Sequence, residues 1–478
     1  MNKNKKFLNL LAGLRGEVTV RDIREVRQKG GVTLIEIPVD HKIHSRPCDD
    51  CGSTYTKKHG LLVFNACHIP QGKRQPCKII CKKQRFLCKS CGNTFVEDVP
   101  WLYKDAHITV PLAECITRDL HSIMTKNDIA RVNCVSTHYV DIILKDLVPP
   151  IPDHLPEVLC LDETFSQVED ELDEKTQWIK FVTNLSDGQT GELLDIIPYR
   201  TKRKLVKYFN GNFSHEERCR VRHLCCDGAK FYMELAGACF PNADVCLDNF
   251  HVTKYLHTGL YSVRTKQQNY LLSKSDALND KYHKEYVDLK HLSHKFITSL
   301  FNQQSYWGDN YGTYVKRIRH HLSICPELKD AYAMLQYYYE IFHDTYDYEK
   351  KTADLDKWIS IFGKSTSEAI ASAVKTVRNH LPYIRNAWKH GFSNAVCEGN
   401  NNVIQTLKDV SFGIHNFEYF RTRTLLIVGQ PGVARAYKKL LDAGINYGSF
   451  FYDDFPSLDD YVLAYDWTSP LKDFSKEG

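Results

Sequence analysis

Three carboxylates of this chain stand where acidic side chains can do chemistry. Asp162 follows the apolar run Val-Leu-Cys-Leu, Asp227 follows Leu-Cys-Cys, and Glu398 lies within Ala-Val-Cys-Glu-Gly-Asn-Asn. A carboxylate at the end of a buried strand meets water at the sheet edge, where open α/β sheets place their sites. Two such aspartates and one glutamate on a helix could hold a pair of divalent metal ions. The pattern therefore indicates phosphoryl transfer on nucleic acid.

The second aspartate of this set has a competitor. A further apolar segment ends at Asp248, and His251 follows three residues later. Asp227 and Asp248 are therefore both candidates for the second metal ligand. His251 could donate a hydrogen bond near a scissile phosphate or brace Asp248, and we favour bracing because metal ions would carry the chemistry.

Two cysteine knuckles, Cys48-Asp-Asp-Cys51-Gly and Cys88-Lys-Ser-Cys91-Gly, have the spacing of a metal site. Each lets two thiolates point at one ion, and two knuckles complete a tetrahedral structural Zn²⁺ site. No export signal is recognisable, so the 17 cysteines should be reduced. Other residues between the knuckles could form a second metal site, but their irregular spacing favours a hairpin; they are His59, Cys67, His68, Cys77 and Cys81.

Basic residues gather in two clusters, although the net charge of +5 does not by itself indicate nucleic-acid binding. Both clusters could meet DNA phosphates, and a solvated face would have the same composition. Arg421, on a later helix, could likewise contact DNA or face solvent. The phosphate contacts that we expect come from Lys82, Lys83 and Arg85 in the first cluster and from Arg200, Lys202 and Arg203 in the second.

The segment 126–144 fits a helix-turn-helix. At the start of its second helix, exposed Thr137, His138 and Tyr139 would reach the DNA groove. An ordinary helical hairpin is the alternative, and the glycine that is common in such turns is absent.

The order of elements predicts a multidomain α/β protein, and 478 residues are enough for several domains. After a proline-rich stretch at 149–152, three strands, a helix, a strand, a helix and a strand predict a mixed sheet. A long helical segment without clear strands follows. We divide the chain into a zinc-ribbon domain (1–100), a helix-turn-helix domain (101–150), the first part of a catalytic core (151–251), an all-helical insertion (252–392), the last part of the core with Glu398 (393–432) and an acidic aromatic tail (433–478).

In order and combination, these motifs resemble DDE-type bacterial insertion-sequence transposases of the ISL-three family. The resemblance covers nearly the whole chain. It rests on the cysteine ribbon with Arg85-Phe-Leu-Cys, on Val135-Ser-Thr-His-Tyr-Val, on Asp162-Glu, on Phe240-Pro-Asn-Ala, on Asp248-Asn-Phe-His-Val, on Ser393-Asn-Ala-Val-Cys-Glu398-Gly-Asn-Asn and on Ser411-Phe-Gly-Ile-His-Asn-Phe-Glu-Tyr-Phe-Arg421.

The resemblance implies an RNase H-like catalytic core that is interrupted by the helical insertion. Asp162, Asp227 and Glu398 would be its metal-binding triad, with Mg²⁺ or Mn²⁺ as the ion. Asp248 and His251 match a D-x-x-H string that such cores carry after the second aspartate.

The implied activity is DNA transposition by two-metal-ion cleavage and strand transfer. The zinc ribbon and helix-turn-helix would bind the terminal inverted repeats of the element, so the partners would be double-stranded DNA of the transposon ends and of the target. We also expect a homodimer or larger synaptic assembly, no membrane association, and a location in the bacterial cytoplasm at the nucleoid. Two alternatives stay open: a DNA-binding regulator with an inactive core, and a metal-dependent DNA nuclease without strand transfer.

Overall fold

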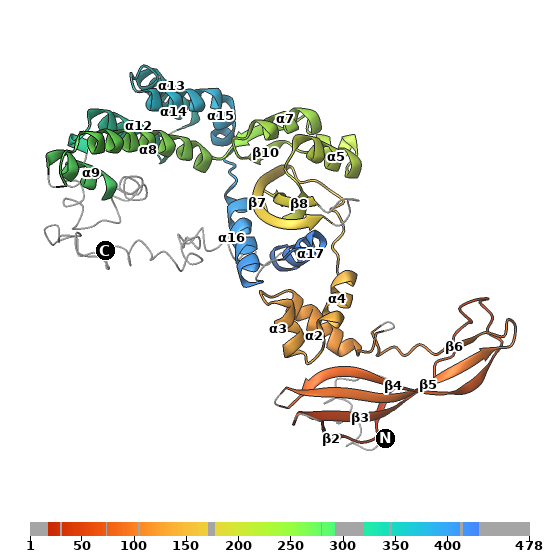
Figure 1. Ribbon diagram of the computed structural model, residues 1–478. Helices are drawn as coiled ribbons and strands as arrows, with labels where there is room; N and C mark the ends of the chain where they lie inside the picture. The colour runs from red at the N-terminus through yellow and green to blue at the C-terminus, as the bar shows by residue number, and fades with distance from the viewer. Residues whose placement is uncertain are drawn as a thin grey trace. The chain divides into compact units, whose positions relative to one another are not determined.

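The computed structural model of the chain describes residues 18–28, 31–72, 74–103, 106–170, 177–278, 280–291, 320, 322–343, 347–411 and 414–429 (Figure 1). The chain forms two compact units. Unit 1 combines the described residues up to Pro150 with Val168–Trp178 and those from Ile404 onward, and unit 2 combines Ile151–Gln167 with Ile179–Val403. The acidic tail expected at 433–478 lies outside the described residues.

Unit 1 begins with an irregular sheet around a long hairpin. Its strand order is β1-β3-β5-β4, with β2 paired to β3 and β6 to β5. Cys77, Ile79 and Cys81 alternate onto the buried face of β5, so these two cysteines pack in the core as the hairpin interpretation expects. The strands are β1 (Val18–Val20), β2 (Arg24–Arg27), β3 (Thr33–His41), β4 (Thr56–Gln71), β5 (Gln75–Cys88) and β6 (Thr94–Val96).

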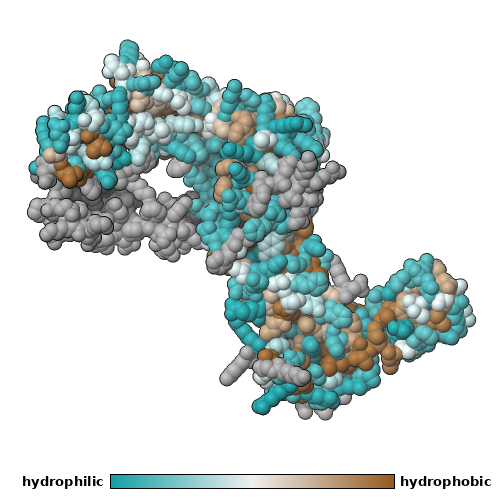
Figure 2. Space-filling model, viewed as in Figure 1, coloured by the Kyte–Doolittle hydropathy of each residue, from teal (hydrophilic) through white to brown (hydrophobic). Residues whose placement is uncertain are grey.

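The outer part of the hairpin is unusually apolar for a surface. Leu61, Leu62 and Val63 of β4 are exposed, and Figure 2 shows hydrophobic residues gathering over part of the β4–β5 hairpin. Alternation of exposure is lost here because neither face of this stretch is covered. Every residue from Lys57 to Val63 is exposed, although Leu61, Leu62 and Val63 pair in regular register with β5.

Three short helices follow in unit 1: α2 (Val110–Leu120), α3 (Lys126–Val132) and α4 (Thr137–Asp146). The side chains of Thr109 and Thr125 cap α2 and α3 by accepting hydrogen bonds from backbone N–H groups. Cys134, in the turn between α3 and α4, has a φ of 53°, the left-handed conformation that glycine usually supplies. The missing glycine is therefore replaced by a cysteine in the same backbone conformation.

Unit 2 contains a five-stranded sheet with the order β11-β10-β7-β8-β9. β10 pairs in parallel with both β7 and β11, whereas β8 and β9 are antiparallel. The near-continuous apolar sequences of β7, β10 and β11 at their paired residues are typical of parallel strands that are buried on both faces. The strands are β7 (Val158–Asp170), β8 (Gln177–Asp187), β9 (Leu193–Pro198), β10 (His223–Cys226) and β11 (Asp244–Leu247).

The two faces of this sheet are covered differently. Leu159, Leu161 and Leu224 pack on the face shared with α5 (Lys202–Asn212) and α7 (Lys230–Cys239). A short helix, α6 (His215–Cys219), precedes β10. The opposite face carries a cysteine-rich cluster with residues from α15 and α16, namely Val158, Cys160, Cys225, Cys246, Ala387, Phe392 and Cys397.

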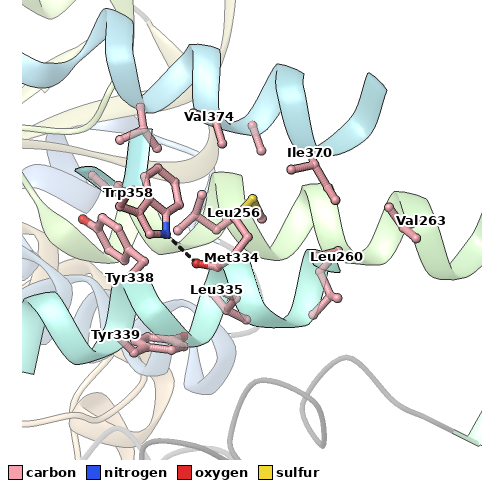
Figure 3. Packing of buried hydrophobic residues seen from close by; sticks show 14 of the residues in the cluster. Leu256, Leu260, Val263, Met334, Leu335, Tyr338, Tyr339, Trp358, Ile370 and Val374 are labelled. Carbon is pink, nitrogen blue, oxygen red and sulfur yellow. Dashed lines mark hydrogen bonds between the residues drawn. The ribbon is translucent and has the colours of Figure 1, made fainter. Parts of the chain in front are cut away.

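Between β11 and α16 the described residues form helices and no strand. Figure 3 shows how Trp358 packs among apolar side chains of this region and donates its indole N–H to the Met334 carbonyl at 2.8 Å. None of the described helices combines the length and apolar character that crossing a membrane requires. The helices are α8 (Asn249–Lys274), α9 (Lys281–His291), α12 (Pro326–His343), α13 (Tyr348–Phe362), α14 (Glu368–Asn379) and α15 (Leu381–His390), followed by α16 (Ala395–Val410) and α17 (Phe417–Val428).

Candidate active site

The cysteine-rich face of the unit 2 sheet places acidic side chains in one row. Register and the two-residue period of a strand define three rows across β7, β10 and β11. The last row lies at the carboxyl ends, where open sheets hold their sites. The rows are Val158, His223 and Asp244, then Cys160, Cys225 and Cys246, then Asp162, Asp227 and Asp248.

Asp162 is buried and held by two hydrogen bonds. The backbone N–H of Glu163 donates to its Oδ1 at 2.8 Å, and Asn401 Nδ2 donates to its Oδ2 at 2.9 Å. Asn401 lies on α16 and accepts in turn from Thr164 of β7 and Asn184 of β8. This amide therefore fixes the orientation of the carboxylate from a distant segment of the chain.

Sequence reasoning did not single out Asn401. The signal was present, because three asparagines follow the glycine after Glu398 on a helix that is otherwise expected to bury apolar residues. A polar side chain one turn from a candidate metal ligand has a geometric reason to be there, since ligating carboxylates are themselves hydrogen-bonded.

The two aspartates that compete for the second position stand at equivalent places. Asp227 follows β10 and accepts a hydrogen bond from the Ala229 N–H at 2.9 Å. Asp248 follows β11, is buried, and directly precedes α8. Both act electrostatically on Asp162, so the structure brings both to the cluster, and the choice between them stays a prediction.

Glu398 completes the cluster from the first turn of α16. Burial, reinforced by the charges of Asp248 and Asp162, raises the pKa of Glu398 to about 7. Burial also raises the pKa of Asp162 to about 7, with added repulsion from Asp227 and other carboxylates. Without a cation, these carboxyl groups hold protons near neutral pH.

This electrostatic arrangement fits a divalent cation. A bound cation would favour the ionised carboxylates, and its attraction would offset their mutual repulsion. The donors are all oxygens, which suit hard ions such as Mg²⁺ and Mn²⁺. Asp162, Asp227 or Asp248, and Glu398 are the residues that could hold such ions.

Residues of α8 and of the connection between α14 and α15 lie beside the loop after Asp227. A Cβ atom at Gly228 would lie 2.2 Å from the Tyr255 hydroxyl, so a side chain at this position would force the tyrosine to move. The Tyr255 ring stacks on His380, whose Nε2 lies 3.3 Å from the Gly228 carbonyl oxygen. His251, in the first turn of α8, is half-buried, and burial lowers its pKa although Asp227 and Asp248 oppose this.

The second basic cluster lies beside the acidic one. Arg200 Nη1 donates to Glu163 Oε2 at 2.6 Å, and its guanidinium lies 4.1 Å from the centre of the Phe181 ring. Lys202 pairs with Glu234 at 2.9 Å, and Arg203 is exposed. Arg200 is thus positioned next to the residue that follows Asp162.

The four knuckle cysteines come together in unit 1. Cys48 and Cys91 have their Sγ atoms 3.6 Å apart, as do Cys51 and Cys88. Four thiolates placed tetrahedrally at 2.3 Å from Zn²⁺ are about 3.8 Å apart, so the observed spacing matches a zinc site and is far too long for a disulfide. Gly52 and Gly92, which follow the knuckles, have φ angles of 71° and 81°.

The backbone of the second knuckle favours the thiolate of one of its two cysteines. Hydrogen bonds from the backbone N–H groups of Cys91 and Ser90 lower the pKa of Cys88 to about 6. At Cys88 the thiolate, which is the form that binds metal, is therefore favoured before any ion arrives. Burial and hydrogen bonds with the neighbouring knuckle thiols instead raise the pKa of Cys91 to about 12.

Among the other residues of unit 1 that are predicted to contact DNA, some are exposed and others pack partly against neighbouring side chains. Thr137, His138 and Tyr139 occupy the first turn of α4, and His138 is exposed while Tyr139 packs partly into the helical core. On β5, Lys82 and Arg85 are exposed, and Lys83 lies over the Phe64 ring at 4.3 Å. DNA contact by these residues stays a prediction.

Arg421 has an internal role in unit 1. Its side chain is 8% exposed and donates to the Pro149 carbonyl at 2.9 Å. Arg423 is buried as well and donates to the carbonyls of Leu120, Ser122 and Met124 at the α2–α3 connection. That Arg421 contacts DNA therefore stays a prediction that its surroundings do not favour.

Comparison with known families gives one extended match. The family model of the ISL-three DDE group, described as Transposase, matches residues 159–424. Among solved structures, the Drosophila P element transposase strand transfer complex is similar with a TM-score of 0.36 and 10% identity, over 68% of this chain and 92% of that chain. No curated protein gives a significant match.

Proposed function

We infer the function from the family: the chain belongs to the ISL-three family of DDE transposases, and we propose that it cuts and joins DNA at the ends of its own insertion sequence. One observation carries this proposal. Asp162 and Glu398, which are far apart in sequence, are half-buried or buried in one acidic cluster where each pKa is raised to about 7. Such clustering is unfavourable unless cations compensate it.

For the architecture, we propose an RNase H-like core interrupted by a helical insertion. The sheet order β11-β10-β7-β8-β9 supports it, because three parallel strands bring Asp162, Asp227 and Asp248 to one edge. The helices from α8 to α15 precede the helix of Glu398. We retain the domain boundaries 1–100, 101–150, 151–251, 252–392, 393–432 and 433–478 as part of this proposal.

We assign the catalytic roles as follows. Asp162, Asp227 and Glu398 hold the divalent ions, with Asp248 as the competitor of Asp227. When bound, two Mg²⁺ or Mn²⁺ ions activate the attacking oxygen and stabilise the leaving one. Asn401 orients Asp162 through its 2.9 Å hydrogen bond, and His251 braces the second aspartate. Water cuts the DNA end, and the released 3′-hydroxyl then attacks target DNA.

DNA binding is proposed for the amino-terminal modules. The four cysteines hold a structural Zn²⁺, and the first turn of α4 presents Thr137, His138 and Tyr139 to base edges. Lys82, Lys83 and Arg85 meet phosphates of the terminal repeats, whereas Arg200, Lys202 and Arg203 meet DNA at the core. Because two ends must be joined, we expect a dimer or larger assembly, acting at the nucleoid in the bacterial cytoplasm.

A cleavage assay tests the proposal. The purified chain with Mg²⁺ or Mn²⁺ should nick DNA that carries the inverted repeats of its element, and Asp162→Asn should not. Asp153→Asn, at an exposed aspartate outside the cluster, is the matched control and should cut like the wild type. Cleavage by Asp162→Asn would overturn the assignment.

Joining separates the proposal from its two alternatives. With a supercoiled target, a transposase yields products in which element ends are linked to target DNA. Cleavage without such products would indicate a nuclease, and repeat binding without cleavage would indicate a regulator.

A further inference from the structure

A second group of metal-ligand side chains lies at the amino ends of strands β10 and β11. His223 is the first residue of β10 and Asp244 the first of β11, and the register pairs them directly. His390 is the last residue of α15. One ligand atom from each of these three residues lies within 4.8 Å of the other two.

The ring nitrogens in this group lack ordinary partners. Nδ1 of His223 and Nε2 of His390 are shielded from solvent and make no hydrogen bond among the described residues. Nε2 of His390 comes within 3.3 Å of Asp244 Oδ2, but without hydrogen-bond geometry. A buried nitrogen that makes no hydrogen bond, as His223 Nδ1 is, is costly, and a shared cation would satisfy both rings and the carboxylate together.

Neighbouring contacts hold the two imidazole rings and the backbone of β11 in place. The two imidazole rings are 4.3 Å apart between centroids, and the Phe392 ring lies 4.9 Å from that of His223. Asn386, one turn before His390, donates to the Val245 carbonyl of β11 at 3.1 Å. The two rings are therefore positioned by packing within the fold, and the strand backbone places Asp244 beside them.

The surroundings also favour a positive ion. His390 ends a helix, where the unsatisfied carbonyls carry partial negative charge. The Asp244 side chain is 57% exposed, which leaves a path for an ion and room for a water ligand.

We propose that His223, Asp244 and His390 form a transition-metal site that takes Zn²⁺ or a similar ion such as Co²⁺ or Ni²⁺. Two imidazoles and one carboxylate are ligands that zinc uses, with the fourth position left to water. Imidazole distinguishes this site from the oxygen-only cluster, which suits Mg²⁺.

The ion would act as a structural link. Along β10, His223 and Asp227 are about 13 Å apart by strand geometry, so the ion would not touch the carboxylate cluster. It would instead fasten the end of α15 to two strands of the sheet. The segment from Gly391 to Asn394 then leads directly to the helix of Glu398.

Zinc stoichiometry tests this site in the full chain. Excess Mg²⁺ occupies the oxygen cluster, and Cys51→Ser removes the cysteine-held ion. After equilibration with Zn²⁺ and dialysis, mass spectrometry of the metal should find one zinc per Cys51→Ser chain. Adding Asp244→Asn or His390→Asn should remove it, whereas His215→Asn, at an exposed histidine of α6, should not.

Cobalt gives a second measurement without the Cys51→Ser change. In the otherwise wild-type chain, His390→Asn should remove one equivalent of Co²⁺ and leave the intense thiolate-to-cobalt absorption of the cysteine site unchanged. Binding of only the cysteine-held ion by the wild type would overturn the proposal. Persistence of the second ion when Asp244→Asn and His390→Asn are combined would overturn it as well.

Discussion

Strands β10 and β11 carry different donors at their two ends. At the carboxyl ends, Asp227 and Asp248 join Asp162 and Glu398 in a set made only of oxygens. At the amino ends, His223 and Asp244 meet His390 in a set dominated by imidazole. Both sets lie on the same face of the same sheet, separated by a row of cysteines.

The difference teaches that donor chemistry, and not the sheet, decides what each end can hold. Hard oxygen donors select Mg²⁺ and Mn²⁺, which serve phosphoryl transfer, whereas imidazole selects zinc-like ions. The carboxyl end is also the electrostatically strained one, because burial raises the pKa of two carboxyl groups there to about 7. Loss of a ligand should therefore abolish DNA cleavage when the ligand belongs to the carboxyl-end set, and not when it belongs to the amino-end set.

The largest expected effect is that of Glu398→Gln. Removing a ligand charge from the oxygen set should reduce DNA cleavage by about a thousandfold or more, which corresponds to about 4 kcal/mol of transition-state stabilisation. Rates of end cleavage measure it. Glu157→Gln changes an exposed glutamate just before β7 and should cleave normally. If Glu398→Gln and Glu157→Gln lost the same fraction of DNA cleavage, the special role of the carboxyl-end set would be contradicted.

Asp227 and Asp248 can be separated by the same assay. We expect Asp227→Asn to reduce cleavage about a thousandfold, because it removes a metal ligand. Asp248→Asn should reduce cleavage only about tenfold to a hundredfold, because it removes a residue next to the ligands. The reverse order would assign the second ligand to Asp248.

A smaller effect is expected for Asn401→Ala. This change removes the hydrogen bond that orients Asp162 but no ligand, so cleavage should fall about tenfold to a hundredfold. Higher Mg²⁺ concentrations should recover part of the loss. Gln405→Ala, at an exposed position of the same helix, serves as the control, and an Asn401→Ala enzyme with wild-type rates at all Mg²⁺ concentrations would contradict the orienting role.

The smallest effect concerns the stability of the metal-free chain. The pKa of Asp162 is about 7 in the folded chain and 3.8 as the ordinary value, so folding favours the protonated form. The stability that this group contributes is present below about pH 4 and is lost as pH rises to about 7.

Asp162→Asn should therefore raise the Tm of the metal-free chain at about pH 8 by a few degrees, although it abolishes cleavage. Thermal unfolding followed by circular dichroism measures this shift. Asp153→Asn should leave the Tm unchanged, and a lower Tm for Asp162→Asn would show that the buried carboxylate is compensated within the protein itself.

Features set by short stretches of sequence could be predicted. The Cys-x-x-Cys-Gly spacing forms a knuckle by local geometry, and the four thiols then need only one hairpin to meet. Apolar runs that end in aspartate identified β7, β10 and β11 of the unit 2 sheet, and the order of motifs predicted the family that the family model confirms. The knuckle and strand signals each lie within about one element of secondary structure.

Features that depend on packing between distant elements could not be predicted. The sequence left open whether Arg421 contacts DNA or lies on a solvated face, and both alternatives expose its side chain. The fold instead buries the whole stretch from Arg421 to Thr424. Likewise, nothing in the sequence pairs Asn401 with Asp162.

The sequence by itself therefore determined which chemical groups stand at the strand ends and in the knuckles of this transposase. Only the tertiary structure decided which of them meet. His223, Asp244 and His390 come from two strands and a helix, and no local spacing links them. The physical reason is that strand register and helix docking are set by the burial of many apolar side chains together, so long-range neighbours follow from the whole core.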